Sequence, residues 1–363
     1  QPNSPSAGLI MSFIRVTSPH AHSANTTAGV MRQVLLATLP GVVALTLYFG
    51  PGTLMNLLLA CTTAVAFEAA VLKLRQRPVM FYLRDYSALV TAVLLGLALP
   101  PYCPWWVVVV GIFFAIVVAK QLYGGLGYNP FNPAMVGYVV LLISFPLEMS
   151  QWATPVGALA DGRTLPSFSD ALAKVFGAAE LDGYSSATPL DTLRQSGGLT
   201  LGDLYSSAAI FNSGRWAGNG WEWVNIGFLL GGAYLLYKRI FTWHAPVAML
   251  ASLGVLAIAF YDSGSSNSAG SPIFHWLSGA TMLGAFFIVT DPVTSAVSNK
   301  GRLIYGAGVG ILVFVIRTWG NYPDAVAFAV LLMNFAAPFI DYYTVPRTYG
   351  HSKAPRATAK KVE

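Results

Sequence analysis

Three carboxylates stand inside or at the end of apolar runs, where an ionised side chain is costly. They are Glu68 in AVAFEAAVL, Asp291 in IVTDPVTSA and Asp341 near the end of the last apolar run. An ionised group at the centre of a bilayer costs at least about 2.5–3.5 kcal/mol, so such a group usually has a partner or a function. We expect all three to be candidate ligands of a cation or a proton. Two simpler interpretations stay open: Glu68 pairs with Lys73, and Asp341 is a solvated helix cap.

Amide and hydroxyl groups accompany residues that break helices at two places. YGGLGYNPFNPA, residues 123–134, contains Asn129 and Asn132 between glycines and prolines, and TDPVTSA contains Thr290, Asp291 and Thr294. Glycine allows positive φ and close backbone approach, while proline prevents a helix from continuing. The polar groups suit a planar heterocycle with donor and acceptor edges, or a cation. The alternative is that Asn-Pro and Asp-Pro simply terminate helices.

A hydroxyl-rich stretch, DGYSSATPLD, occupies residues 182–191. Judged by composition alone, such a stretch is a turn or a helix N-cap, with a helix beginning at Thr188-Pro189.

The elements that must position these residues are membrane helices. Of the 363 residues, 55% are hydrophobic and 10% are charged, whereas about 25% of the residues of a soluble domain are charged. Ten apolar runs approach the length of about 20 residues that spans a hydrocarbon core. We therefore expect an all-α polytopic membrane protein with about ten transmembrane helices, some of them short or broken. The runs are residues 33–49, 52–72, 87–100, 105–122, 134–148, 224–237, 243–261, 274–290, 303–319 and 324–342.

The lysines and arginines predict an orientation, because cytoplasmic segments retain positive charge during insertion. With the N-terminus in the cytoplasm, most basic residues fall on the inner side, and both termini are cytoplasmic. The basic residues on the outer side are then Arg163, Lys174, Arg194, Arg215 and Arg317. Short juxtamembrane clusters account for the net charge of +6, so we expect no nucleic-acid binding.

The predicted organisation divides the chain between its apolar runs. The segments are a cytoplasmic N-terminal segment (1–32), a first five-helix repeat (33–148), an extracytoplasmic loop (149–223), a second five-helix repeat (224–342) and a cytoplasmic C-terminal tail (343–363).

An internal repeat supports this division. SALVTAVLLGLALPP and SGATMLGAFFIVTDP are related by an offset of 191 residues, which aligns Ser87 with Ser278 and Pro101 with Pro292. An offset of 190 aligns PAMVGYVVLL with PDAVAFAVLL. Because five is an odd number, the second repeat enters the membrane from the opposite side. Inverted repeats with broken helices characteristically build a site near the bilayer midplane. Chance matches of proline and leucine between apolar helices are the alternative.

Several motifs resemble one known family. The stretch 182–191 resembles the flavinylation motif D-x-x-(S/T)-G-A-T, at which a dedicated transferase joins FMN to the final threonine through its phosphate. Together with residues 119–146, 277–294 and 322–351, it resembles the D-subunit family of Rnf electron-transport complexes. That family is similar to the B subunit of the sodium-pumping NADH:quinone oxidoreductase. The resemblance extends from about residue 11 to 351. One departure is Ser186, which stands where the motif usually has glycine.

The resemblance implies cofactors. It makes Thr188 the attachment site of covalent FMN, and it makes Asp182, Ser185 and Ala187 recognition elements for the transferase. It also implies a second, noncovalent flavin, riboflavin, for which the broken helices are the natural pocket. We assign to that pocket the polar side chains of the two loops, namely Asn129, Asn132 and Thr294.

The resemblance also implies a function. The chain is expected to be a membrane flavoprotein subunit of an ion-translocating ferredoxin:NAD⁺ oxidoreductase in a bacterial cytoplasmic membrane, active only within the complex and with no catalytic side chain of its own. It would relay electrons between partner subunits and help couple them to Na⁺ or H⁺ movement. Cys61 and Cys103 are too few for an iron–sulfur or structural metal site, so iron–sulfur and NAD sites belong to partners. The alternatives are a channel or transporter with inverted repeats, and a structural membrane anchor.

Overall fold

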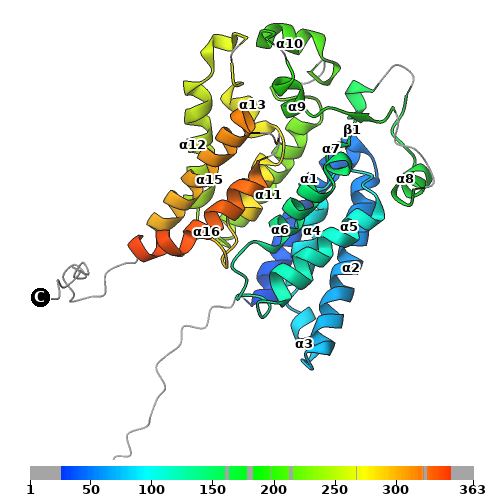
Figure 1. Ribbon diagram of the computed structural model, residues 1–363, viewed down its shortest axis with the longest axis vertical. Coiled ribbons are helices and arrows are strands. Elements are labelled where there is room, and N and C mark those ends of the chain that lie inside the picture. Colours follow the sequence, from blue (N-terminus) through cyan, green and yellow to red (C-terminus); the bar gives the residue numbers. More distant parts are fainter. Residues whose placement is uncertain are drawn as a thin grey trace, which may run out of the picture.

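The structure is a computed structural model that describes residues 26–159, 163–177, 183–196, 198–211, 216–266, 268–320, 322 and 325–344. Asp182 lies outside the described residues. The described part is mostly helical. Figure 1 shows α1–α7 on one side and α11–α16 on the other, with α9 and α10 at one end and α8 beside the first group.

The first group of helices precedes residue 151. It consists of α1 (Thr27–Phe49), α2 (Gly52–Leu74), α3 (Val79–Leu83), α4 (Ser87–Ala98), α5 (Trp105–Ile112), the π-helix η1 (Phe113–Gln121), α6 (Pro133–Ser144) and α7 (Pro146–Ser150). Side-chain caps set two of the starts: Thr26 caps α1, and Asn132 caps α6, whose first residue is a proline. Proline suits this first position because it has no N–H to leave unpaired.

The connecting segment is made of short elements. It contains β1 (Trp152–Ala153), η2 (Val156–Ala158), α8 (Phe168–Val175), β2 (Ser185–Ser186), α9 (Pro189–Arg194), α10 (Leu201–Ser207) and η3 (Ala209–Phe211). Strands β1 and β2 pair antiparallel, with Trp152 opposite Ser186. The Thr154 amide extends this ladder by donating to the Tyr184 carbonyl at 2.8 Å.

The second group begins at residue 221. It consists of α11 (Trp221–Tyr237), α12 (His244–Ala259), η4 (Asp262–Gly264), α13 (Pro272–Leu277), α14 (Thr281–Leu283), the π-helix η5 (Gly284–Ile288), α15 (Asn299–Trp319) and α16 (Val326–Thr344). The apolar run 274–290 therefore does not form one helix but three pieces, interrupted at Ser278.

Several helices have the dimensions of membrane spans. Within the described residues, four are long and apolar enough to cross a bilayer, namely α1, α2, α15 and α16. Leu47, Leu58 and Phe335 on these helices are 65–71% exposed, as expected for side chains that face lipid. Shorter apolar helices accompany them, including α4, α6 and α12. The architecture is consistent with a polytopic membrane protein.

The shortest apolar segments are covered by protein. A 12-residue helix such as α4 is only about 18 Å long, whereas a hydrocarbon core is about 30 Å thick. Most side chains of α4, and every residue of α14 and η5, are buried. Burial in protein is the condition under which a helix can end or break at membrane depth.

Helices α1 and α11 pack along each other and join the two groups. Gly227 and Gly231 of α11 face the backbone of α1 at Pro40 and Ala37, where a Cβ atom would collide. Small residues allow such close helix contact in membranes. Helices α6 and α16 form a second contact between the groups. Residues of α4 and η5 line the space between these two contacts.

Candidate functional site

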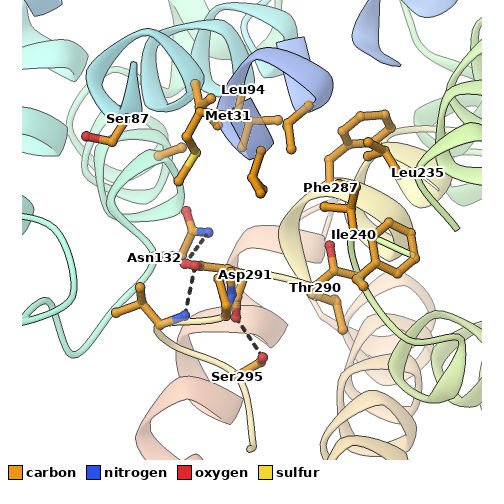
Figure 2. Close-up of a pocket in the computed structure, with 18 of the residues that line it drawn as sticks. Met31, Ser87, Leu94, Asn132, Leu235, Ile240, Phe287, Thr290, Asp291 and Ser295 are labelled. Carbon is orange, nitrogen blue, oxygen red and sulfur yellow. Dashed lines mark hydrogen bonds between the residues drawn. The ribbon is translucent and has the colours of Figure 1, made fainter. Parts of the chain in front are cut away.

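A cavity of about 250 Å³ lies between the two groups of helices. Its walls come from α1, α4, the end of η1, the loop before α6, the end of α11 and the segment after it, η5 and the residues that follow η5, with single residues of α12 and α15. Figure 2 shows part of this lining. Ligand pockets commonly measure about 300–1,000 Å³, so this cavity is close to the size of a small heterocyclic ligand site. Asn129, Asn132 and Asp291 all line it.

Asp291 is the point where the polar residues of the two groups meet. Its Oδ2 accepts hydrogen bonds from Asn132 Nδ2 at 3.3 Å and from Thr294 Oγ1 at 2.9 Å, and its Oδ1 accepts one from the Val293 amide at 3.1 Å. Asn132 and Asp291 are 159 residues apart in sequence. Figure 2 shows the two side chains directed toward each other across the cavity wall. Three residues selected from the sequence for different ligands thus form one hydrogen-bonded group.

Two further residues extend this group into the bundle. Tyr305 of α15 and Asn334 of α16 are buried and are hydrogen-bonded to each other at 2.6 Å. The side-chain amide of Asn334 satisfies both of its polar atoms when its oxygen and nitrogen exchange places. In that orientation Nδ2 donates to the Thr294 carbonyl and Oδ1 accepts from the Asn132 backbone amide at 2.9 Å. The network therefore fixes the loop after η5 against the start of α6.

Asn129 is placed differently. It lies in a loop where Gly124, Gly125 and Gly127 have positive φ, a conformation that glycine adopts without a steric penalty. Its Nδ2 donates to the Phe131 carbonyl at 3.0 Å. Its Oδ1 is buried and has no hydrogen-bond partner among the described residues. A buried acceptor without a partner costs about 1–3 kcal/mol, so a ligand that donates a hydrogen bond in the cavity would stabilise this loop.

Glu68 forms an ion pair inside the first group of helices. Its Oε1 is 2.7 Å from Lys120 Nζ, and both side chains are 2% exposed. Lys120 also donates to Ser87 Oγ at 2.7 Å, while Gln121 Nε2 donates to the same Glu68 oxygen at 2.6 Å. The partner expected from the sequence, Lys73, is therefore not the one observed. Lys73 lies on the same helix as Glu68, α2. Lys120 comes instead from the last turn of the π-helix η1, which packs against α2 and directs the lysine side chain toward Glu68.

Asp341 stands apart from the cavity. It is half-buried near the end of α16, and its Oδ1 accepts a hydrogen bond from the Val297 amide at 2.9 Å. This contact joins α16 to the segment before α15. In the described structure the Asp341 carboxylate therefore accepts a hydrogen bond from a backbone amide, as a capping side chain does.

Thr188 is the N-cap of α9, as the composition of the stretch predicts. Its Oγ1 donates to Asp191 Oδ2 at 2.7 Å and accepts from the Asp191 amide at 3.2 Å. Together with the bond from the Thr188 amide to Asp191 Oδ2, this forms a capping box. Thr188 is only 8% exposed, whereas Ser185 and Ala187 are exposed. The hydroxyl is therefore neither free nor on the open surface.

Tyr184 fastens this stretch to α8. Lys174 Nζ lies 3.5 Å from the centroid of the Tyr184 ring and 5.4 Å from that of Tyr102, which is cation–π geometry. Burial lowers the pKa of Lys174, and the charge of Asp170 partly opposes that shift. Arg163 donates to the Gly183 carbonyl at 2.5 Å. Cationic residues thus hold the strand that leads to Thr188.

Comparison with known proteins identifies the family. A model described as the NQR2, RnfD, RnfE family matches residues 14–350. The chain belongs to this family. It is 64% identical over 349 residues to the D subunit of the ion-translocating oxidoreductase complex of Cellvibrio japonicus, covering 96% of this chain and 98% of that protein. The proteins of the same name from Ectopseudomonas mendocina and Aliivibrio salmonicida are 60% and 53% identical, each over 94% of this chain and over 97% and 100% of those proteins. The resemblance inferred from the motifs is confirmed.

Sequence reasoning misses several polar residues of this bundle. It places Lys120 only as a basic residue on the inner side, and it does not select Gln121, Tyr305 or Asn334. Each is a polar side chain in an apolar helix, and all four are buried. That property is the available signal, because an isolated polar group within an apolar run needs a partner.

Proposed function

We propose that this chain acts as the D subunit of an Rnf-type ion-translocating ferredoxin:NAD⁺ oxidoreductase complex. The carrying observation is the match to proteins of that name at 53–64% identity over nearly the whole chain. The chain relays electrons between partner subunits through flavins, and it works only within the complex. The partners are the other membrane, iron–sulfur and flavin subunits of the complex.

We propose Thr188 as the attachment site of FMN. The motif places Asp182, Ser185 and Ala187 before it, and the exposed Ser185 and Ala187 are accessible to a flavin transferase. An ester oxygen has no proton to donate, so modification removes the bond from Thr188 Oγ1 to Asp191. The transferase must therefore open the first turn of α9 before it can reach the hydroxyl. The short length of α9, six residues, keeps the cost of this opening small.

We propose the cavity between the two groups as the site of the noncovalent riboflavin. When bound there, a flavin supplies one- and two-electron redox chemistry. The unpartnered Oδ1 of Asn129 suits a ring N–H donor, and Asn132 and Thr294 hold Asp291 in a fixed position on the wall. Apolar residues such as Leu94, together with Phe287, supply surfaces for a planar ring. These groups orient a heterocycle and exclude water from it.

We propose Glu68 and Asp291 as the carboxylates that take part in cation movement, with Asp341 a weaker candidate. Glu68 Oε2 is buried without a hydrogen-bond partner among the described residues, so one oxygen is available for a proton or for Na⁺. Lys120 balances the charge of the other oxygen. Because both Lys120 and Asp291 line the cavity, a change in ligand charge there acts on both carboxylate sites through a medium of low dielectric constant.

We also propose the membrane arrangement. The two groups are inverted five-helix repeats, residues 33–148 and 224–342, in a bacterial cytoplasmic membrane with both termini in the cytoplasm. The start of α1 and the end of α16 lie at the same end of the bundle, opposite α9 and α10 (Figure 1), which supports this topology. Residues 149–223 then lie outside, where the transferase acts.

The test is a flavin analysis of the complex purified from cells that contain the transferase. We expect this chain to fluoresce as a flavoprotein band after denaturing electrophoresis, and riboflavin to appear in the supernatant after precipitation. A variant with Asn129→Leu should retain the fluorescent band and lose riboflavin. A channel, transporter or structural anchor would yield neither flavin, and that result would contradict the proposal.

A further inference from the structure

Helix α8 has an apolar stripe that no described residue covers. Phe168, Leu172 and Phe176 are 63%, 45% and 57% exposed. Their spacing of four residues places Phe168 and Leu172 on one face of the helix, and Phe176, the C-cap residue, continues the same row. Ala171 and Val175 beside them are buried against the protein. Exposed large apolar side chains in such a row indicate a surface that contacts something other than water.

The polar side of α8 has the opposite character. Asp170 lies two residues from Leu172, on the far side of the helix, and it is exposed and completes a capping box with Ser167. Helix α8 is therefore amphipathic, with one apolar stripe, one buried face and one polar face. This is the pattern of helices that lie in the plane of a membrane surface.

Contacts fix the level of α8 along the bundle. A Cβ atom at Gly50, which follows α1, would lie 3.9 Å from Cβ of Leu165, just before α8. Lys174 Nζ lies 5.4 Å from the ring of Tyr102, just before α5. Helix α8 also packs against α2. Helix α8 is thus held level with the ends of α1, α2 and α5.

The apolar outer surface of the bundle begins at the same level. Leu54, in the first turn of α2, is 41% exposed, and Trp105, the first residue of α5, is 43% exposed. Exposed tryptophan at the end of a membrane helix is typical of the bilayer interface. The stripe of α8 therefore continues a surface that already faces lipid.

We propose that α8 lies on the bilayer surface, with Phe168, Leu172 and Phe176 inserted among the lipid acyl chains. The continuity with Leu54 and Trp105 favours lipid over a protein partner. Lys174 connects α8 to the Tyr184 ring at 3.5 Å, directly before β2. The anchored helix thereby holds the hydroxyl-rich stretch close to the membrane. This inference does not depend on the flavin assignments.

The test compares two nitroxide labels on opposite sides of α8. Leu172→Cys and Asp170→Cys are made separately in a chain whose Cys61 and Cys103 are replaced by alanine, because residues two apart lie on opposite sides of a helix. Each labelled chain is assembled into the complete complex in proteoliposomes. Collision rates are measured with oxygen, which concentrates in the bilayer, and with a water-soluble nickel complex.

We expect the ratio of oxygen to nickel collisions to be several-fold higher at position 172 than at position 170. Two outcomes would overturn the proposal. High nickel accessibility at both positions would show that α8 stands in water. Low accessibility to both reagents at position 172 would show that a protein partner covers the stripe.

Discussion

Replacing Lys120 by methionine removes the charge that neutralises Glu68 while keeping a side chain of similar length. The two charged atoms are 2.7 Å apart, which corresponds to about 6 kcal/mol of attraction at an effective dielectric constant of about 20. Desolvation offsets part of this. Breaking one side of a buried pair typically costs about 3–5 kcal/mol, because the remaining charge stays buried. We therefore expect Lys120→Met to lower the free energy of unfolding by about that amount.

The double variant Glu68→Gln/Lys120→Met should recover most of this loss. A neutral glutamine at position 68 can still accept the bond from Gln121 Nε2, and no charge remains buried. The matched control is Lys73→Met on the same helix as Glu68, because Lys73 is exposed. Surface changes of this kind usually alter stability by less than about 0.5 kcal/mol.

The assay is an SDS unfolding titration in mixed micelles, followed by tryptophan fluorescence, on all four proteins. Two results would refute the reasoning. One is a double variant as unstable as Lys120→Met, since the cost would then not come from the unpaired carboxylate. The other is a Lys73→Met variant as unstable as Lys120→Met, since Glu68 would then depend on Lys73.

Three further predictions concern function and topology. Thr188→Val should give an inserted protein without covalent FMN, whereas Ser185→Ala should keep it; in-gel flavin fluorescence checks both, and a fluorescent Thr188→Val band would exclude this attachment site. Asp291→Asn should lower ion-dependent turnover of the complex while riboflavin stays bound; wild-type turnover would remove Asp291 from the cation path. Cysteines at Arg84 and Ser207 should react with an impermeant reagent from opposite sides of the membrane, and reaction from the same side would contradict the proposed topology.

Short-range features of this chain could be predicted from sequence. Thr188 is the N-cap of α9 because a hydroxyl, a proline and an acidic residue follow one another at capping-box spacing. The apolar runs and their proline breaks likewise indicated membrane helices, since length and composition decide insertion.

Partners between distant segments could not be predicted in this way. Glu68 has a basic residue five positions away, yet its observed partner Lys120 is 52 residues away. The choice depends on how α2 packs against η1 and on the wider i→i+5 turns of a π-helix, which shift the direction of the side chains. Asn132 and Asp291 meet for a similar reason, because the packing of the two groups of helices brings their loops together. The spacing of residues in the sequence does not show how these helices align against one another, so it does not show which distant side chains meet.

The most direct test of the central claim is peptide mass spectrometry of the chain isolated from the complex, expressed together with its flavin transferase. The relevant peptide contains residues 183–194. We predict that it carries one FMN, joined as a phosphoester to Thr188, with fragment ions that place the added mass on that residue. An unmodified peptide, or FMN on Ser185, Ser186 or Thr192 instead, would contradict the account.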